Sequence, residues 1–325
     1  MSINQCHFFI NSAYTLFNAS ISLPSYWLII KKHYPWLTLV RVNVQKKARS
    51  TSGILTVFRE ISTVMDRWEG KVALVTGASS GIGTQIVKAL AKNGMKVIAI
   101  ARRLGKLEEL AASIKSEFNG KAYPMACDVR QEEEILKVFK WAEEELGGVD
   151  VMINNAGVIV TEPIIEGSTE NYRKILDVNV LAMAICSREL VQSVKKRNVS
   201  GHIININSVA GHYAEIIAMP ISLYSCSKYA VTAMSTNLRN EITRAKLDVK
   251  VTSISPGIVD TEMLRNAVTD LGVNKNFEEV LMLKDTDIAD AVIYSLNVPH
   301  YVQICEVIIT AHEALSAKDP RPYSK

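Results

Sequence analysis

The stretch that decides the fold is Thr76-Gly77-Ala78-Ser79-Ser80-Gly81-Ile82-Gly83, a glycine-rich turn. It follows an apolar run at residues 72–76 and precedes residues 82–93, where apolar side chains recur with helical spacing. Three glycines alone often only make a loop. A glycine turn between a strand and a helix, however, is typical of a dinucleotide phosphate site.

Each glycine of the turn has an expected task. Gly77 permits the tight turn, Gly81 lets backbone approach a pyrophosphate, and Gly83 lets the helix pack closely. The free amides and the dipole at the start of the helix favour negative charge there. The predicted phosphate-binding residues are Gly77, Ser79, Ser80, Gly81, Ile82 and Gly83.

Outward from this turn, short β-rich runs alternate with longer helical patterns. The runs are apolar on both faces, as strands covered by helices on both sides must be. They span residues 72–76, 96–101, 122–127, 151–154, 202–207, 249–255 and 302–310. The helical patterns span residues 82–93, 105–117, 131–146, 169–197, 223–246 and 286–297. This alternation predicts one α/β domain over 65–325, doubly wound in the Rossmann manner, with a seven-stranded parallel sheet flanked by helices.

The second run ends in Arg102-Arg103, where the cofactor ribose is expected. A carboxylate here would suit the 2′-hydroxyl of NAD, whereas arginine suits the 2′-phosphate of NADP. We expect Arg102 to bind that phosphate with support from Arg103, and Ser79 is a further candidate; a solvated arginine pair is the alternative. NADP(H) is therefore the preferred cofactor, with NAD(H) as the other option.

Two further strand ends supply candidate cofactor contacts. Asp128-Val129 follows the third run, where an adenine would lie. Asn154-Asn155-Ala156-Gly157 ends the fourth, and its small residues would let backbone pass close to the cofactor. Asn155, Ala156 and Gly157 are therefore predicted to line the site.

Tyr224 and Lys228 open a long helical pattern and lie on one helix face, four residues apart. A free phenol has a pKa of about 10, and a nearby ammonium favours its ionised form. We therefore expect Lys228 to lower the pKa of Tyr224 and make it a proton shuttle. By itself the pattern also fits an exposed pair, but its place after the fifth strand of a nucleotide-binding sheet favours the catalytic interpretation.

Two more polar residues point to the same crevice. Ser208 closes the fifth run, at the carboxyl edge where parallel sheets bind ligands, so its hydroxyl can hydrogen-bond a substrate oxygen. Asn179 lies inside a helical stretch, although asparagine is a poor helix former. A polar role facing the crevice would explain it; a cap or surface asparagine is the alternative.

Taken together, TGASSGIG, NNAG, the Asn179 segment, INSVAG, YSCSK and Ser255-Pro256-Gly257 resemble the short-chain dehydrogenases/reductases in order and spacing over 65–325. The resemblance implies that Tyr224 is the acid/base and that Lys228 binds the nicotinamide ribose. It also implies that Ser208 polarises the substrate oxygen and that Asn179 holds a water of the proton relay. Residues implied to back the nicotinamide are Pro256, Gly257, Val259 and Thr261.

Within the family, the chain resembles insect farnesol dehydrogenases and the related NADP-dependent vertebrate steroid and carbonyl reductases most, through residues 65–71, 201–208 and 228–233. The separation of Ser208 from Tyr224 exceeds the common pattern by about three residues, which fall within 212–223. The expected pocket rim is Tyr213, Ile216, Ile217, Met219, Ile258, Val259, Met263 and Leu264. Such an apolar rim suits a lipophilic alcohol or carbonyl substrate, and simple loop packing is the alternative.

Three functions remain open at this point. The first is an NADP-dependent dehydrogenase of isoprenoid alcohols such as farnesol. The second is a broad carbonyl or 3-/17-ketosteroid reductase. The third is a catalytically silent NADP(H)-binding protein, against which the intact Tyr224, Lys228, Ser208 and Asn179 argue. Relatives imply a homodimer or homotetramer.

The composition of the chain bears on which binding partners and metal sites are expected. The net charge of +4 comes from residues 1–64, which hold seven Lys/Arg and one acid, so the remainder is near neutral and does not favour nucleic acid. Five widely spaced cysteines predict buried free thiols, with Cys226 as a packing residue, and no metal site.

Residues 1–64 show no clear helical or strand periodicity and no firm membrane span. We expect them to be an upstream extension, disordered or dispensable, outside a cytoplasmic catalytic domain at 65–325. A weakly membrane-associating tail and a weak targeting segment are the alternatives, and either could alter the location.

Overall fold

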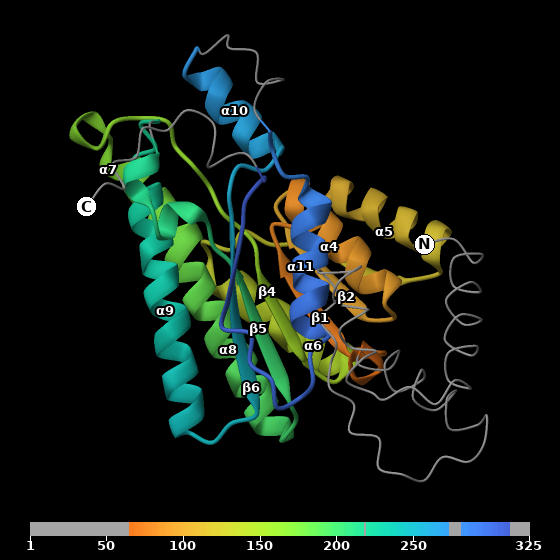
Figure 1. Ribbon diagram of the computed structural model, residues 1–325. Coiled ribbons are helices and arrows are strands. Elements are labelled where there is room, and N and C mark those ends of the chain that lie inside the picture. The colour runs from red at the N-terminus through yellow and green to blue at the C-terminus, as the bar shows by residue number, and fades with distance from the viewer. Residues whose placement is uncertain (1–64, 218, 273–280, 313–325) are drawn as a thin grey trace, which may run out of the picture. The chain divides into compact units, whose positions relative to one another are not determined.

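The computed structural model describes residues 65–217, 219–272 and 281–312, so the predicted extension 1–64 lies outside the described residues. A seven-stranded, all-parallel sheet forms its centre, as predicted (Figure 1). The strand order is β3-β2-β1-β4-β5-β6-β7. The strands are β1 (Val72–Thr76), β2 (Lys96–Ala101), β3 (Lys121–Ala126), β4 (Val151–Asn154), β5 (Gly201–Ile206), β6 (Val249–Pro256) and β7 (Glu306–Ile309).

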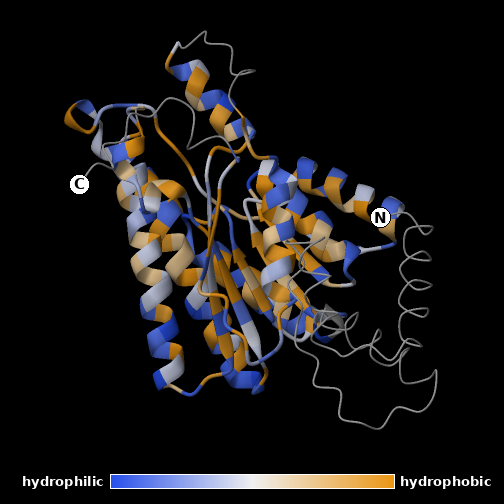
Figure 2. Ribbon diagram, in the orientation of Figure 1, coloured by the Kyte–Doolittle hydropathy of each residue, from blue (hydrophilic) through white to orange (hydrophobic). Residues whose placement is uncertain are grey.

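Helices cover both faces of the sheet because neighbouring strand residues point to opposite sides. Val75 joins the core under α4 (Gly81–Lys92), α5 (Leu104–Phe118) and α11 (Asp285–Leu296). Leu74 joins the core under α6 (Glu132–Leu146), α8 (Ala182–Arg197) and α9 (Tyr224–Arg244). Figure 2 shows central strands that are mainly hydrophobic and helices that carry both kinds of residue. The fold is thus the predicted doubly wound Rossmann arrangement.

The order of the strands along the sheet reverses between β1 and β4, and this switch point positions the site. The chain runs outward through β2 and β3, then returns to place β4 on the other side of β1. Ligands of such sheets bind outside the carboxyl ends at this point. Hydrogen bonds fix the two ends together: the Thr76 hydroxyl accepts from the amides of Asn155 at 3.0 Å and Ala156 at 2.9 Å. Asn155 Nδ2 donates in turn to the Thr76 carbonyl at 2.9 Å.

The edges of the sheet differ from the expectation. β3 and β7 are only half-buried, and β7 is four residues long instead of the predicted 302–310. Side chains hold the backbone before β7, since Lys250 Nζ donates to the carbonyls of Pro299 and Val302, and the Thr252 hydroxyl donates to that of Ile304. These backbone carbonyls therefore accept hydrogen bonds from side chains and not from the backbone of a neighbouring strand.

Helical segments also differ from the pattern. The predicted helix at 169–197 is divided into α7 (Thr169–Leu176), a π-helical turn (Asp177–Leu181) and α8. An unpredicted helix, α10 (Glu262–Asp270), begins after Thr261, whose hydroxyl accepts from the Leu264 amide at 3.3 Å. Short 3₁₀ turns occur at Met65–Trp68, Ile164–Glu166, Val209–Gly211 and Ala214–Ile216.

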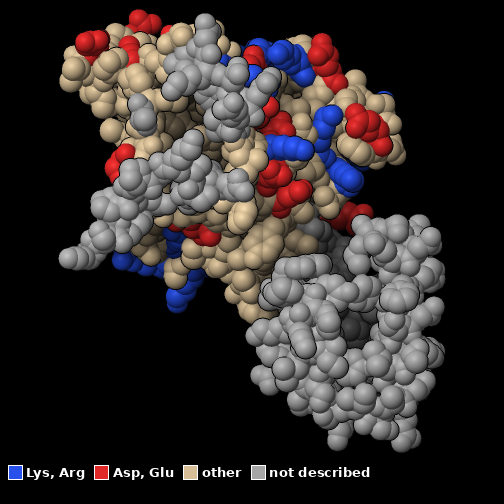
Figure 3. Space-filling view, turned by 45° about the horizontal axis from the view of Figure 1, so that its top comes forward, with Lys and Arg blue, Asp and Glu red and all other residues tan. Residues whose placement is uncertain are grey.

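Within the described ranges, no helix is both long and apolar enough to cross a membrane. The face in Figure 3 shows Lys and Arg side chains beside Asp and Glu side chains.

Cys127 and Cys186 are buried free thiols, as predicted, but Cys226 and Cys305 are exposed. The packing role expected for Cys226 is therefore wrong, because its position on α9 faces away from the core.

Candidate active site

A cavity of about 670 Å³ runs along the carboxyl ends of the strands, a volume within the usual range of ligand pockets. All the predicted cofactor-binding residues line it. From the strand ends and loops these are Gly77, Ser79, Ser80, Gly81, Ile82, Gly83, Arg102, Arg103, Asp128, Val129, Asn155, Ala156, Gly157, Pro256, Gly257, Val259 and Thr261, and from α9 they are Tyr224 and Lys228. Ser208 lines the same cavity.

The glycine turn has the shape that a dinucleotide cradle requires. Gly77 and Gly81 have φ of +65° and +53°, a region that L side chains rarely adopt. A Cβ at Gly77 would lie 2.9 Å from the Cα of Ala156, and one at Gly83 would collide with the Gly77 carbonyl. The turn is therefore held against both β4 and its own helix, and its residues fit the proposed pyrophosphate contact.

Charged side chains gather at the β2 end of the cavity. Arg102 and Arg103 both line it, and Arg103 also contacts Ser79, Ser80 and Glu262. On the neighbouring strand end, a hydrogen bond from Arg130 lowers the pKa of the Asp128 carboxyl. Arg130 also lines the cavity. It was missed in the sequence, where only Asp128 and Val129 were named at this strand end.

Three of the four predicted catalytic residues meet in this cavity. Tyr224 is the first residue of α9, and Lys228 lies one turn later, with its Nζ 5.6 Å from the centre of the tyrosine ring. Ser208 follows β5 and caps the 3₁₀ turn Val209–Gly211, its hydroxyl accepting from the Ala210 amide at 3.1 Å. One helix start and one strand end thus converge on the position where a substrate oxygen could bind.

The pKa of Tyr224 differs from the expectation. Burial raises the pKa of Tyr224, and the hydrogen bond with the Ser208 hydroxyl acts in the opposite direction. Burial also lowers the pKa of Lys228 to about 8, and its Nζ donates to the Ile206 carbonyl at 2.9 Å. Burial is the largest effect on the phenol, so the pKa of Tyr224 is raised overall and not lowered as expected.

The Asn179 side chain does not line the cavity. It is fully buried in the π-helical turn, where its Oδ1 accepts from the Val158 amide at 2.8 Å. Its Nδ2 donates to the Val158 carbonyl at 3.0 Å and to the Ser227 hydroxyl at 3.0 Å. The prediction that the Asn179 side chain faces the crevice is therefore wrong. Its amide instead connects the loop after β4 to α9. Its implied contact with a relay water stays a prediction.

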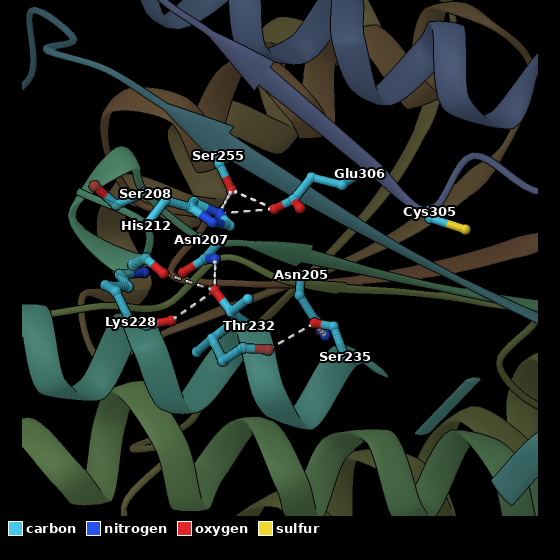
Figure 4. Close-up of polar contacts among 12 residues, drawn as sticks. Asn205, Asn207, Ser208, His212, Lys228, Thr232, Ser235, Ser255, Cys305 and Glu306 are labelled. Atoms are coloured by element: carbon cyan, nitrogen blue, oxygen red, sulfur yellow. Dashed lines mark hydrogen bonds and ion pairs between the residues drawn. The ribbon is translucent and has the colours of Figure 1, made fainter. Parts of the chain in front are cut away.

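A second set of polar contacts joins His212, Ser255 and Glu306, which do not line the cavity (Figure 4). His212 Nε2 lies 3.0 Å from Ser255 Oγ and 2.8 Å from Glu306 Oε1, and Ser255 also donates to Glu306 at 3.1 Å. Both partners contact the same ring nitrogen, whereas a hydrolytic relay needs them on opposite nitrogens. The trio therefore connects the loop after Ser208 to β6 and β7 and does not make a nucleophile.

Buried amides also fix α9 to the sheet. Asn154 Nδ2 donates to Asn205 Oδ1 at 2.9 Å. Asn205 Nδ2 donates in turn to Ser235 of α9 at 2.9 Å (Figure 4). Asn207 Nδ2 donates to Thr232 of the same helix at 2.9 Å. Sequence reasoning missed these positioning residues, although asparagines at the carboxyl ends of two apolar strands, β4 and β5, were a visible signal.

Many of the residues that line the same cavity are apolar. The predicted rim residues among them are Ile216, Ile217, Met219, Ile258, Val259, Met263 and Leu264, joined by the unpredicted Ile159 and Ile221. Tyr213 was predicted to belong to the rim but does not line the cavity. Its side chain is 45% exposed and lies beside the ring of His212. The lining also includes residues of α10, which the sequence pattern had not indicated.

Known proteins are similar to this chain in sequence and architecture. Residues 71–272 match the short chain dehydrogenase family. Farnesol dehydrogenase of Aedes aegypti is 45% identical over 75% of this chain and 97% of its own length. Dehydrogenase/reductase SDR family member 11 of Gallus gallus is 44% identical over 78% of this chain and all of its own length. An alcohol dehydrogenase from the archaeon Thermococcus sibiricus, solved with 5-hydroxy-NADP, is 29% identical, with a TM-score of 0.63 over 74% of this chain and 95% of its own.

Proposed function

Because the chain belongs to the short-chain dehydrogenase family of NAD(P)-dependent oxidoreductases, we propose that it interconverts a lipophilic alcohol and its carbonyl compound with NADP(H). One observation carries this proposal. Tyr224, Lys228 and Ser208 line the same cavity as the glycine turn, and many apolar residues line it too. Acid–base groups, a dinucleotide cradle and an apolar pocket are the parts that such a reaction needs.

In the proposed mechanism a bound nicotinamide supplies or accepts the hydride. The Ser208 hydroxyl holds the substrate oxygen, and the Tyr224 hydroxyl donates a proton to that oxygen during carbonyl reduction. Since burial raises the pKa of Tyr224, the phenol is protonated at neutral pH and ready to act as the acid. We assign the cofactor ribose to Lys228, which lies one helical turn from Tyr224.

The NADP(H) preference is proposed from Arg102 and Arg103, which line the cavity after β2. Guanidinium groups suit phosphate because they offer several donors in one plane. The Thermococcus sibiricus relative is described with an NADP derivative, which supports the same preference. We expect Arg102→Ala to weaken NADPH binding far more than NADH binding in equilibrium titrations; equal losses would contradict the assignment.

For the substrate we propose an isoprenoid alcohol of the farnesol type. The apolar residues of the cavity and the 45% identical farnesol dehydrogenase support this class. The experiment is oxidation of farnesol by the full chain with NADP⁺, followed at 340 nm, beside a panel of ketones and steroids. We expect farnesol turnover. Turnover of ketones alone would favour a broad carbonyl reductase, and tight NADPH binding without any turnover would favour a silent binder.

A further inference from the structure

The guanidinium of Arg103 is held by an acid at the phosphate end of the cavity. Its Nη1 lies 3.0 Å and 3.1 Å from the two carboxylate oxygens of Glu262, and its Nη2 lies 3.2 Å from one of them. The same guanidinium donates to the hydroxyls of Ser79 at 3.1 Å and Ser80 at 2.8 Å. Five hydrogen bonds thus join the end of β2, the glycine turn and the first residue of α10.

These partners are the ones that a phosphate would use. Ser79, Ser80 and Arg103 all belong to the predicted cofactor-binding set, and all line the cavity with Glu262. Carboxylate and phosphate are both recognised by the paired donors of a guanidinium. The Glu262 carboxylate therefore occupies donors that the 2′-phosphate of NADP(H) would need, whereas NAD(H) has no group to compete for them.

From this geometry we propose that Glu262 competes with the 2′-phosphate for Arg103 and so sets the ratio of NADP(H) to NAD(H) affinity. The inference rests on the proposed cofactor preference. Binding of NADP(H) requires Arg103 to exchange the carboxylate for the phosphate, and the lost ion pair lowers the net affinity. Binding of NAD(H) leaves the pair intact.

The charges around Glu262 keep this competition active at neutral pH. Hydrogen bonding to Arg103, followed by its charge, holds the pKa of the Glu262 carboxyl below the ordinary value, and Ser80 and Lys106 act in the same direction. The carboxylate also lies in the first turn of α10, where the helix dipole favours a negative charge. Both side chains are nearly half exposed, so the competing pair is a modest, displaceable interaction.

The test is the affinity of the full chain for each cofactor, measured as the change in NADPH or NADH fluorescence on titration. We expect Glu262→Gln to bind NADPH about two- to fivefold more tightly, which matches the usual size of an exposed ion pair. NADH affinity should stay unchanged. Glu143→Gln is the control, because Glu143 forms an exposed ion pair with Lys196 and neither of these residues lines the cavity.

Two further variants separate direct competition from a simple change in net charge. Glu262→Asp keeps the charge but shortens the side chain, so it should also bind NADPH more tightly. In an Arg103→Ala background, Glu262→Gln should no longer raise NADPH affinity. Two results would overturn this inference and leave the proposed function standing. One is that the unchanged protein binds NADPH tightly but Glu262→Gln leaves the ratio of NADPH to NADH affinity unchanged. The other is that the gain in NADPH affinity from Glu262→Gln persists in the Arg103→Ala background. Failure of the unchanged protein to bind NADPH would overturn the proposed function as well.

Discussion

The Nζ atom of Lys228 lies 5.6 Å from the centre of the Tyr224 ring and donates a hydrogen bond to the Ile206 carbonyl at 2.9 Å. Both side chains come from the first two turns of α9, and burial moves their pKa values in opposite directions. The phenol is therefore neutral and the lysine charged at neutral pH. This pairing places a proton donor beside a cation within the cavity.

A pH dependence of carbonyl reduction follows from the Lys228 pKa of about 8. Below that pH the ammonium is charged, and above it the charge is lost. We expect kcat/KM for reduction, which reports the free enzyme, to be level below pH 8 and to fall above it. Circular dichroism over the same range is the control for unfolding. A profile that stays level to pH 10 would contradict the assigned state of Lys228.

Gly83→Ala tests the close packing of α4 on the glycine turn. The added Cβ would collide with the Gly77 carbonyl, so we expect a loss of about 1–3 kcal/mol of unfolding free energy and weakened cofactor binding. Gly105→Ala in α5 is the matched control, because its Cβ would meet nothing within 4 Å. Alanine is the better helix former there, so this change should be neutral or slightly stabilising. Equal effects of the two substitutions would refute the packing argument.

His202 should make the protein less stable in acid. Burial, followed by the charges of Lys250 and Arg67, lowers the pKa of His202 from 6.5 to about 3. The unfolded chain therefore binds the extra proton between these values, and stability falls as pH drops from 6.5 toward 3 at about 1.4 kcal/mol per unit. We expect His202→Gln to flatten this slope in urea titrations at pH 7 to 4. The exposed His300→Gln should keep it, and an unchanged slope in His202→Gln would exclude the assignment.

The central strands and the cavity lining could be predicted because local chemistry determines them. The glycine turn must lie between a strand and a helix, and Tyr224 must lie on the same helix face as Lys228. Covered parallel strands also show as apolar runs, which identified β1, β2, β4 and β6 within a residue of their observed bounds.

The remaining features depend on contacts that sequence spacing does not show. The shortened β7 follows from side chains of β6 that hold the preceding carbonyls. The buried position of Asn179 depends on the π-helical turn, which turns its amide toward Val158. The raised pKa of Tyr224 depends on burial, a property of the assembled cavity. The start of α10 did carry a local signal, in Thr261 followed by Glu262.

The measurement that tests the central claim most directly is the turnover of Tyr224→Phe with NADPH affinity determined on the same sample. Phenylalanine keeps the ring but removes the hydroxyl that transfers the proton. We predict unchanged NADPH affinity and turnover reduced about 10²- to 10⁴-fold, the usual contribution of general acid–base catalysis. Turnover close to that of the unchanged protein would contradict the assignment of Tyr224 as the acid/base.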